Sequence, residues 1–177
     1  MPLCVVTAPN AISLRVLTAG KPQLTLDDDI RIIASAQIFD ALKPEQLRLL
    51  AFGAERLRFN AGRKIFRDGD RADCGFVIAS GRINLIKTLD GEDHVIKTVE
   101  PGNILGEMAL LTETNRLTSA IADADTEVIR INRALFARML SEYPETAAAI
   151  HAELSKRLKD FIAEIARLDR QFSGDIF

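Results

Sequence analysis

The residues with the clearest chemical potential lie in the segment Pro101–Ala122, PGNILGEMALLTETNRLTSAIA. Its first three residues predict a turn, and Gly106 lets the backbone approach a ligand closely. Glu107–Leu111 then predicts a short helix, whose first N–H groups are free to attract an anion. Arg116 follows, and a guanidinium can make a two-pronged contact to phosphate oxygens. The segment therefore predicts a site for a phosphate-bearing ligand.

Glu107 has a different expected role in this segment. A carboxylate cannot hold a phosphate, so we expect Glu107 to accept a hydrogen bond from a sugar hydroxyl beside the phosphate. The alternative is an ordinary surface salt bridge between Glu107 and Arg116. The surrounding glycines, the helix start and the flanking strand-like runs favour the ligand.

Composition indicates a folded protein of one domain with a terminal extension, because 47% of the 177 residues are hydrophobic. The formal net charge of -2 leaves no general basic surface for nucleic acid. Cys4 and Cys74 form no C-x-x-C motif, which argues against a zinc site or a disulfide framework. The early apolar run Leu3–Val6 is too short for a signal or a membrane span. We therefore expect a cytoplasmic protein with no membrane span.

Three parts are expected along the chain. Residues 1–26 show no clear period and are interpreted as an extension of uncertain order. Residues 27–143 are predicted to form the binding domain and residues 144–177 a long C-terminal helix with a tail. In the binding domain, a first helix is expected from Leu26 to about Phe39, capped by Asp27–Asp29, and a second from Pro44 to about Gly53.

Between Glu55 and Ile131 the pattern changes to short strand-like runs separated by glycine turns. Asp90-Gly91 predicts a type I′ hairpin turn. Many short strands at this spacing are typical of a small barrel or jelly roll. The expected strands are Leu57–Phe59, Lys64–Phe66, Phe76–Ile78, Ile83–Ile86, His94–Val99, Thr118–Ala122 and Glu127–Ile131.

After Asn132 the pattern is helical again, and a long run is expected from about Pro144 to about Phe172. Its apolar residues are spaced as in the a/d seam of a coiled coil, which predicts a homodimer. The alternative is a helix that packs on its own domain. The seam residues are Leu154, Leu158, Phe161, Ile165, Leu168 and Phe172.

Taken in order, these elements resemble the cyclic nucleotide-binding domain of the bacterial catabolite activator family, cyclic nucleotide-dependent protein kinases and cyclic nucleotide-gated channels. The resemblance runs from about Ile38 to Leu168. It implies a mainly β protein, a β-jelly-roll (double-stranded β-helix) with N-terminal helices and a long C-terminal helix. It rests on Ala61-Gly62, Ile65-Phe66, Gly69-Asp70, Ala72-Asp73, Phe76–Ile78, Ser80-Gly81, Pro101-Gly102, Gly106–Leu111 and Arg116.

The resemblance also implies a role for each residue of the segment. Glu107 would bind the ribose 2′-hydroxyl and Arg116 the cyclic phosphate, with the backbone amides near Gly106 to Met108 completing the phosphate contacts. The next two positions, Leu117 and Thr118, would adjoin them.

The resemblance further places the purine against Leu85 and Ile96. It implies a lid formed by the C-terminal helix around Phe161 and Ile162.

The sequence departs from the family pattern at two places. Family members usually carry Ser or Thr directly after the arginine, and Leu117 removes a common source of preference for cGMP, so cAMP is favoured. After the long helix only Gln171–Phe177 remain, too few for a helix-turn-helix reader. The resemblance therefore implies a stand-alone domain that acts on an unknown protein partner without binding DNA directly.

No Ser-His-Asp, Cys-His or paired-carboxylate arrangement indicates an enzyme, and neither His94 nor His151 has partners at metal or catalytic spacing. We predict a regulatory module without metal or cofactor, which binds a cyclic nucleotide and transmits occupancy through its C-terminal helix. The rival hypothesis is a structural or scaffold dimer that keeps the fold but binds no nucleotide or senses a different effector.

Overall fold

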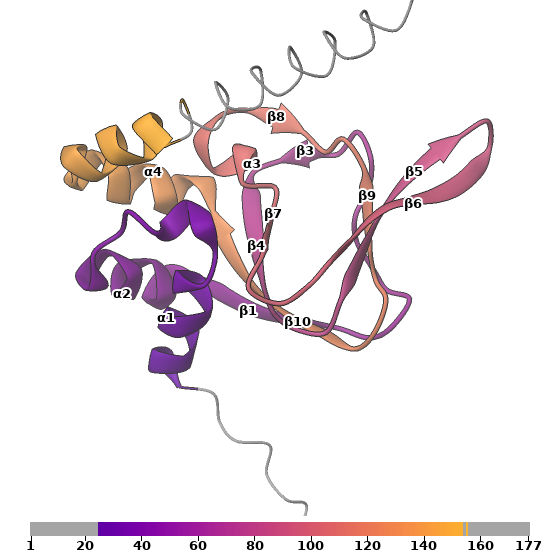
Figure 1. Cartoon of the computed structure of the whole chain (residues 1–177), viewed down its shortest axis with the longest axis horizontal. Coiled ribbons are helices and arrows are strands. Elements are labelled where there is room, and N and C mark those ends of the chain that lie inside the picture. The colour runs from indigo at the N-terminus through magenta and orange to yellow at the C-terminus, as the bar shows by residue number, and fades with distance from the viewer. Residues whose placement is uncertain (1–24, 154, 156–177) are drawn as a thin grey trace, which may run out of the picture.

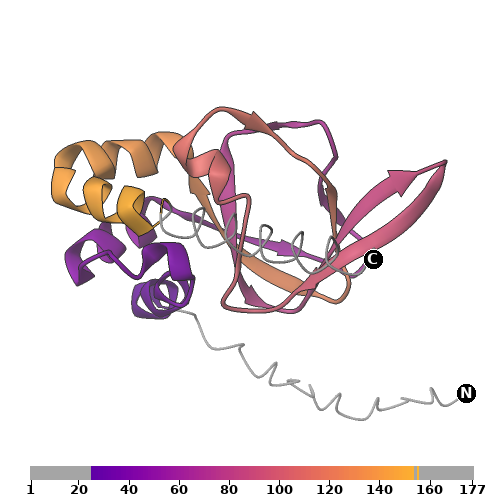
Figure 2. The ribbon, with the colours of Figure 1, turned by 45° about the horizontal axis from the view of Figure 1, so that its top comes forward.

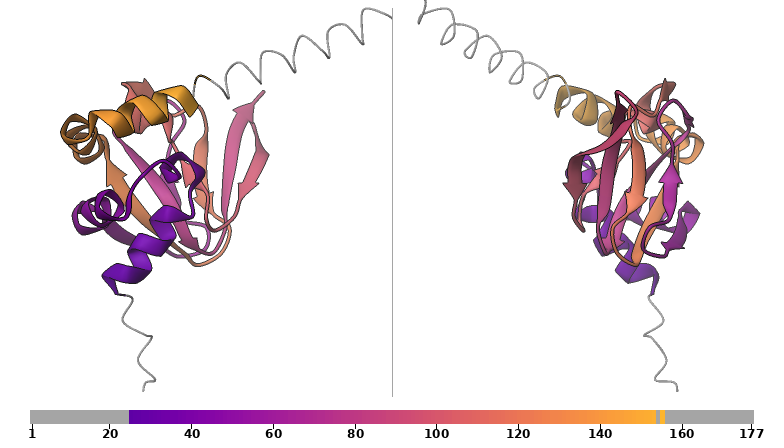
Figure 3. Two further views of the ribbon diagram at one scale, coloured as in Figure 1. Left: turned by 60° about the vertical axis from the view of Figure 1, so that its left-hand side comes forward. Right: turned by 90° about the vertical axis from the view of Figure 1, so that its right-hand side faces the viewer.

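The computed structural model describes residues 25–153 and 155. Helices α1, α2 and α4 gather on one side of a β-roll, and the hairpin of β5 and β6 projects from the other side (Figures 1 and 3). Within the described residues, no helix is both long and apolar enough to cross a membrane.

The first helix, α1 (Leu26–Ala34), is shorter than the sequence predicts. Its N-cap is Thr25 rather than an aspartate, and Thr25 and Asp28 form a reciprocal capping box. The helix ends where Ser35 Oγ donates 2.6 Å to the carbonyl of Ile32. A separate 3₁₀ helix, η1 (Gln37–Phe39), follows, and this break buries the side chain of Phe39.

The second helix, α2 (Pro44–Gly53), agrees with the prediction and has proline in its first turn. Its buried Gln46 donates 2.8 Å to Thr146 Oγ1. Thr146 belongs to the helical residues 144–153 that follow α4 (Arg133–Glu142). This hydrogen bond joins the N-terminal and C-terminal helices of the described chain. The predicted continuation of the last helix to Phe172 lies outside the described residues.

The strands form two four-stranded sheets and one two-stranded ribbon, and all pairs are antiparallel. The jelly-roll prediction is confirmed. One sheet contains β1 (Glu55–Phe59), β10 (Thr126–Asn132), β4 (Cys74–Ser80) and β7 (Ile104–Leu105), in that order. The other contains β2 (Lys64–Phe66), β9 (Ser119–Ala122), β5 (Ile83–Leu89) and β6 (Glu92–Val99), and the ribbon contains β3 (Arg71–Ala72) and β8 (Thr114–Asn115).

Every predicted strand run falls on one of these strands, whereas β3, β7 and β8 were not predicted. Asp90 and Gly91 both have positive φ, 53° and 85°, and lie between the paired Leu89 and Glu92. A two-residue loop with this backbone is the predicted type I′ turn. The tight turn produces the projecting hairpin seen in Figure 2.

The strand β4 contributes to both hydrophobic cores. Val77 packs in the core formed with the helices, which includes Phe39 and Phe136. Its neighbours in the strand, Phe76 and Ile78, point into the core between the sheets. Helix packing and sheet packing are therefore coupled through one strand.

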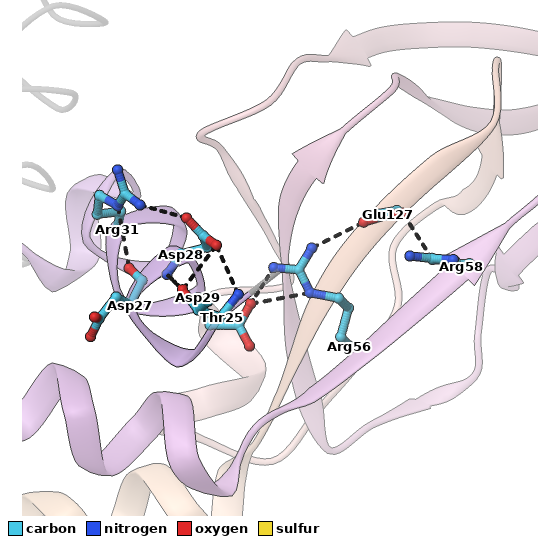
Figure 4. A network of polar contacts seen from close by, with 8 residues as sticks. All are labelled: Thr25, Asp27, Asp28, Asp29, Arg31, Arg56, Arg58 and Glu127. Atoms are coloured by element: carbon cyan, nitrogen blue, oxygen red, sulfur yellow. Dashed lines mark hydrogen bonds and ion pairs between the residues drawn. The ribbon is translucent and has the colours of Figure 1, made fainter. Parts of the chain in front are cut away.

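A network of charged side chains fixes α1 to the β-roll (Figure 4). Arg56 of β1 contacts Asp29 of α1 and donates 3.0 Å to Glu127 of β10. Glu127 also pairs with Arg58 at 2.8 Å. Since Arg56, Asp29 and Glu127 are about four-fifths buried, these ion pairs are screened less than those on an open surface.

Candidate ligand-binding site

A cavity of about 590 Å³ lies between the start of α3 (Met108–Leu111), the inner face of β5 and β6, and the segment from β8 to β9. It brings together seven of the residues that the sequence predicts for the site: Leu85, Gly106, Glu107, Met108, Arg116, Leu117 and Thr118. Ile96 does not line the cavity. Phe161 and Ile162, the predicted lid, lie outside the described residues.

Arg116 is the most buried charged side chain of the cavity, with 6% of its surface exposed. Its Nη2 donates 2.7 Å to the carbonyl oxygen of Cys74, at the start of β4. Its Nη1 is buried and has no hydrogen-bond partner within the described residues. A buried unpaired donor is costly, so the guanidinium is held by one arm while the other arm still needs an acceptor.

The backbone of Arg116 is also fixed. Its N–H donates 2.8 Å to the carbonyl of Asp70, and its carbonyl accepts 2.8 Å from the N–H of Gly69. Farther along, Lys87 Nζ donates 3.0 Å to the carbonyl of Leu117 and pairs with Asp68 at 2.7 Å. The loop before β3 and the strand β5 therefore hold the arginine segment from both sides.

Two aromatic rings support the guanidinium. Cζ of Arg116 lies 4.3 Å from the centroid of the Phe66 ring and 5.5 Å from that of Phe76. The two rings are stacked, with centroids 6.0 Å apart. A cation over an aromatic face keeps the N–H groups at the edge of the guanidinium available for hydrogen bonds. The sequence analysis did not find this contact, because it depends on how β2 and β4 approach the arginine.

The electrostatics of this end of the cavity favour an anion. Burial lowers the pKa of Arg116, because desolvation disfavours the charged form, while Cys74, Asp73 and Asp70 act in the opposite direction. Burial also raises the pKa of the Cys74 thiol, which therefore stays protonated near neutral pH. No acidic side chain within the described residues forms an ion pair with Arg116. An entering phosphate would supply the missing negative charge.

Gly106 is the residue that leaves room for this arginine. Its φ is +70°, and a Cβ at this position would lie 2.0 Å from Nη1 of Arg116. Both the backbone conformation and the space therefore require glycine. The sequence predicts that Gly106 lets a ligand come close to the backbone. The structure adds a second reason for a glycine at this position, which is that the side chain of Arg116 comes close to it.

Glu107 precedes α3 as its N-cap residue. The described residues give its carboxylate no ion pair or side-chain hydrogen bond, although it lines the cavity and is half-buried. The carbonyls of Gly106 and Glu107 accept from Ala109 and Leu110, at 3.0 and 3.1 Å. Within the described chain, the N–H groups of Gly106, Glu107 and Met108 donate to no other backbone group. This corner of the cavity thus combines free donors with one free acceptor.

The opposite end of the cavity is formed by β5 and β6. Leu85 lies opposite Lys97 in the register, and Lys97 and Val99 line the cavity. Ile96, predicted to face the purine, is 58% exposed instead. Lys97 and Val99 keep one register with Leu85 and Ile83, so alternation along β6 puts Lys97 on the face of the buried Val99 and Ile96 on the outer face.

Lys97 was missed by the sequence analysis. One signal could have found it, since Lys97 precedes the buried Val99 by two residues, and alternate residues of a strand share a face. Across the described residues, no group of three or more His, Cys, Asp or Glu side chains could hold a metal ion.

Comparison with known proteins supports the same interpretation. The model of the cyclic nucleotide-binding domain matches residues 56–143. The chain is 32% identical over 129 residues to a cyclic AMP receptor protein of Thermus thermophilus, a match that covers 72% of this chain and 60% of that protein. The chain therefore spans less than two thirds of the length of this relative.

Two solved structures are also similar. A cyclic nucleotide-binding-like protein from Brucella abortus is 55% identical with a TM-score of 0.61, and the match covers 65% of this chain and 99% of that one. The regulatory domain of Toxoplasma gondii PKA, solved with cAMP, is 26% identical with a TM-score of 0.62, covering 67% of this chain and 46% of that one. This family is regulatory rather than catalytic, and the fold, the matched region and these relatives agree that the chain belongs to the cyclic nucleotide-binding domain family.

Proposed function

We propose that this chain is a regulatory module of the cytoplasm, not an enzyme, that binds cAMP in preference to cGMP and passes the occupancy of its cavity to a protein partner. The observation that carries the proposal is Arg116, which is buried, held by the Cys74 carbonyl, and left with an unpaired Nη1. A phosphate oxygen is the acceptor that best satisfies such a group.

The remaining contacts follow from the chemistry of the cavity. The cyclic phosphate would accept from Arg116 and from the free N–H groups near Gly106. The ribose 2′-hydroxyl would donate to the unpaired carboxylate of Glu107, and the purine would pack against Leu85 and Val99. The names of two relatives, a cyclic AMP receptor protein and a PKA regulatory domain solved with cAMP, support this class of ligand.

The preference for cAMP rests on Leu117, which lines the cavity beside the arginine and is 79% exposed. A leucine offers no hydroxyl to the 2-amino group of guanine or to the phosphate. A site without such a partner forms no hydrogen bond with the 2-amino group of cGMP, although that group must still lose its bound water when the ligand enters.

Transmission would run from α3 to the C-terminal helices. Leu110 of α3 is buried in the same core as Phe136 and Met139 of α4. A ligand that repositions the start of α3 can therefore shift α4 and the helix after it. Such a shift carries a signal only if the nucleotide binds one helix position more tightly than another.

Calorimetry with cAMP and cGMP tests the proposal directly. We expect cAMP to bind more tightly, and Arg116→Leu to weaken its binding by about thirtyfold or more, because removing the charged partner of a phosphate costs about 2 to 5 kcal/mol. Arg63→Leu is the control, since it removes an exposed arginine outside the cavity. No heat with either nucleotide at millimolar concentration would refute nucleotide binding, and undiminished affinity in Arg116→Leu would refute this site.

We propose further that the module is a homodimer through the apolar seam that contains Leu158. Sedimentation of Leu158→Asp against the parent chain checks this part separately. The parent should sediment as a dimer and the variant as a monomer. A parent that is already monomeric would reject the seam without touching the binding proposal.

A further inference from the structure

Phe66 faces the cavity from the strand β2. It is directly opposite Ala120 of β9, which is itself directly opposite Leu85 of β5, so the three side chains share the inner face of one sheet. Phe66 and Leu85 both line the cavity, and no other aromatic residue of the described chain does. The cavity therefore contains one aromatic ring, and the guanidinium of Arg116 lies over it.

The positive charge of Arg116 is not neutralised by an acidic side chain in contact with it. Arg116 forms no ion pair with a described residue. Asp73 pairs with Arg130 at 3.9 Å, and the carboxylate of Asp70 accepts 2.8 Å from the N–H of Arg67. A charged side chain that is only 6% exposed and lacks such a partner is costly. Another group must offset this cost in the free protein.

The face of the Phe66 ring is best placed to do so. Cζ of Arg116 lies 4.3 Å from its centroid, within the range of a cation–π contact, and 5.5 Å from the centroid of Phe76. Such contacts are strongest where water is excluded. Phe76 stacks on Phe66 with the centroids 6.0 Å apart and belongs to the core between the sheets, so it helps to hold the Phe66 ring in place.

An aromatic ring and a carboxylate would affect an entering phosphate differently. A carboxylate would accept hydrogen bonds from the N–H edge of the guanidinium, which is the edge that a phosphate uses, and the ligand would have to displace it. An aromatic face attracts the charge without accepting those hydrogen bonds. The free site can therefore keep a charged Arg116 and leave its Nη1 open for a ligand.

We propose that Phe66 is a positioning residue that takes the place of a carboxylate beside Arg116. The electrons of its ring, and not only its bulk, hold the guanidinium where the phosphate binds. This inference rests on the proposed function, and it names a residue outside the segment Pro101–Ala122 on which the affinity for the phosphate depends.

Calorimetry on ring variants tests the electronic part of the inference. Phe66→Leu should weaken the binding of cAMP and cGMP equally, by about tenfold, because both ligands carry the same phosphate. Phenylalanines with one, two and three ring fluorines at position 66 withdraw electrons from the ring face in steps, with little change in size. We expect the affinity to fall with each added fluorine. Equal affinity across this series would overturn the inference.

Phe59→Leu is the matched control. Phe59 and Phe66 are both partly buried and pack against the core between the sheets, but Phe59 neither lines the cavity nor makes a ring contact with Arg116. Both substitutions should lower the melting temperature by similar amounts, whereas Phe59→Leu should keep the affinity within about twofold of the parent. An equal loss of affinity in the two variants would mean that packing alone is responsible, which would also overturn the inference.

NMR spectra of the ligand-free protein separate this inference from the proposed function. The side-chain signals of Arg116, identified by their absence in Arg116→Leu, should be shifted by the ring current of Phe66 in the parent and in Phe59→Leu. This shift should disappear in Phe66→Leu, and unchanged signals there would overturn the inference even if cAMP binds. If the parent bound neither nucleotide while the shift depended on Phe66, the proposed function would fail and the role of the ring in holding the guanidinium would be supported.

Discussion

The two ends of the cavity differ in how deeply their charged side chains are buried and in how many contacts hold those side chains. At one end, Arg116 is 6% exposed, lies over the ring of Phe66 and donates to the carbonyl of Cys74. At the other end, every residue of β6 before Val99 is exposed, and the ammonium group of Lys97 has no hydrogen bond or ion pair within the described residues. The first end is fixed before any ligand arrives, whereas the second is formed by β5 and the edge strand β6, which make up a projecting hairpin (Figure 2).

This difference suggests a division of roles. A preorganised charged group provides affinity without a cost of reorganisation, and it acts on a phosphate that all cyclic nucleotides share. Substitutions around it would disturb the core, since Phe76 belongs to the cluster between the sheets. Side chains on an exposed edge strand can change at little cost in stability. Affinity should therefore depend on the Arg116 end, and selectivity on the β6 end.

The largest effect is expected for Gly106→Ala. A Cβ at this position would lie 2.0 Å from Nη1 of Arg116, so the guanidinium must leave its place over Phe66. We expect cAMP affinity to fall about thirtyfold or more, as for loss of the arginine itself, and cGMP affinity to fall by the same factor. Calorimetry with both nucleotides measures the two losses.

Gly91→Ala is the matched control for Gly106→Ala. Gly91 also has a positive φ, +85°, but a Cβ there would meet nothing within 4 Å. It introduces the same kind of backbone strain without the collision. We expect its affinity to stay within about twofold of the parent. If Gly106→Ala bound cAMP as well as Gly91→Ala does, the fixed arginine would not be the source of affinity.

A smaller effect is expected for Glu107→Gln. The neutral amide can still accept from a ribose hydroxyl, but a hydrogen bond to a charged acceptor is stronger, so cAMP should bind about tenfold more weakly. The substitution should affect cGMP equally, because both ligands carry the same sugar. Binding of 2′-deoxy-cAMP should be unchanged by it, since that ligand has no hydroxyl to donate. A loss for 2′-deoxy-cAMP as large as for cAMP would contradict the assigned role.

The Arg116 end could be predicted in part from the sequence, because its parts are close along the chain. Gly106, Glu107 and Arg116 fall within eleven residues, and their order implies a turn, a helix start and a strand. The surroundings of Arg116 could not be predicted. Phe66 and the carbonyl of Cys74 reach it only through the tertiary arrangement of β2 and β4.

The β6 end shows a different reason for failure. Hydrophobicity selected Ile96 over Lys97, but alternation along β6 puts Lys97 on the face of the buried Val99 and Ile96 on the outer face. Because successive side chains of a strand point to opposite faces, a choice that is wrong by one residue selects the wrong face. The short strands β3, β7 and β8 were missed for a related reason. Two residues carry no alternating pattern, and their structure comes from distant partners such as β4.

Leu117 tests the division between an end that sets affinity and an end that sets selectivity, because it adjoins Arg116 but is proposed to affect the choice of base. Its side chain is 79% exposed, so Leu117→Thr should leave stability nearly unchanged. A hydroxyl that reaches the 2-amino group of guanine should strengthen cGMP binding about threefold to fivefold and leave cAMP nearly unchanged. Leu117→Val is the control, since valine has the shape of threonine without the hydroxyl. An equal gain in both variants would mean that bulk and not hydrogen bonding disfavours cGMP.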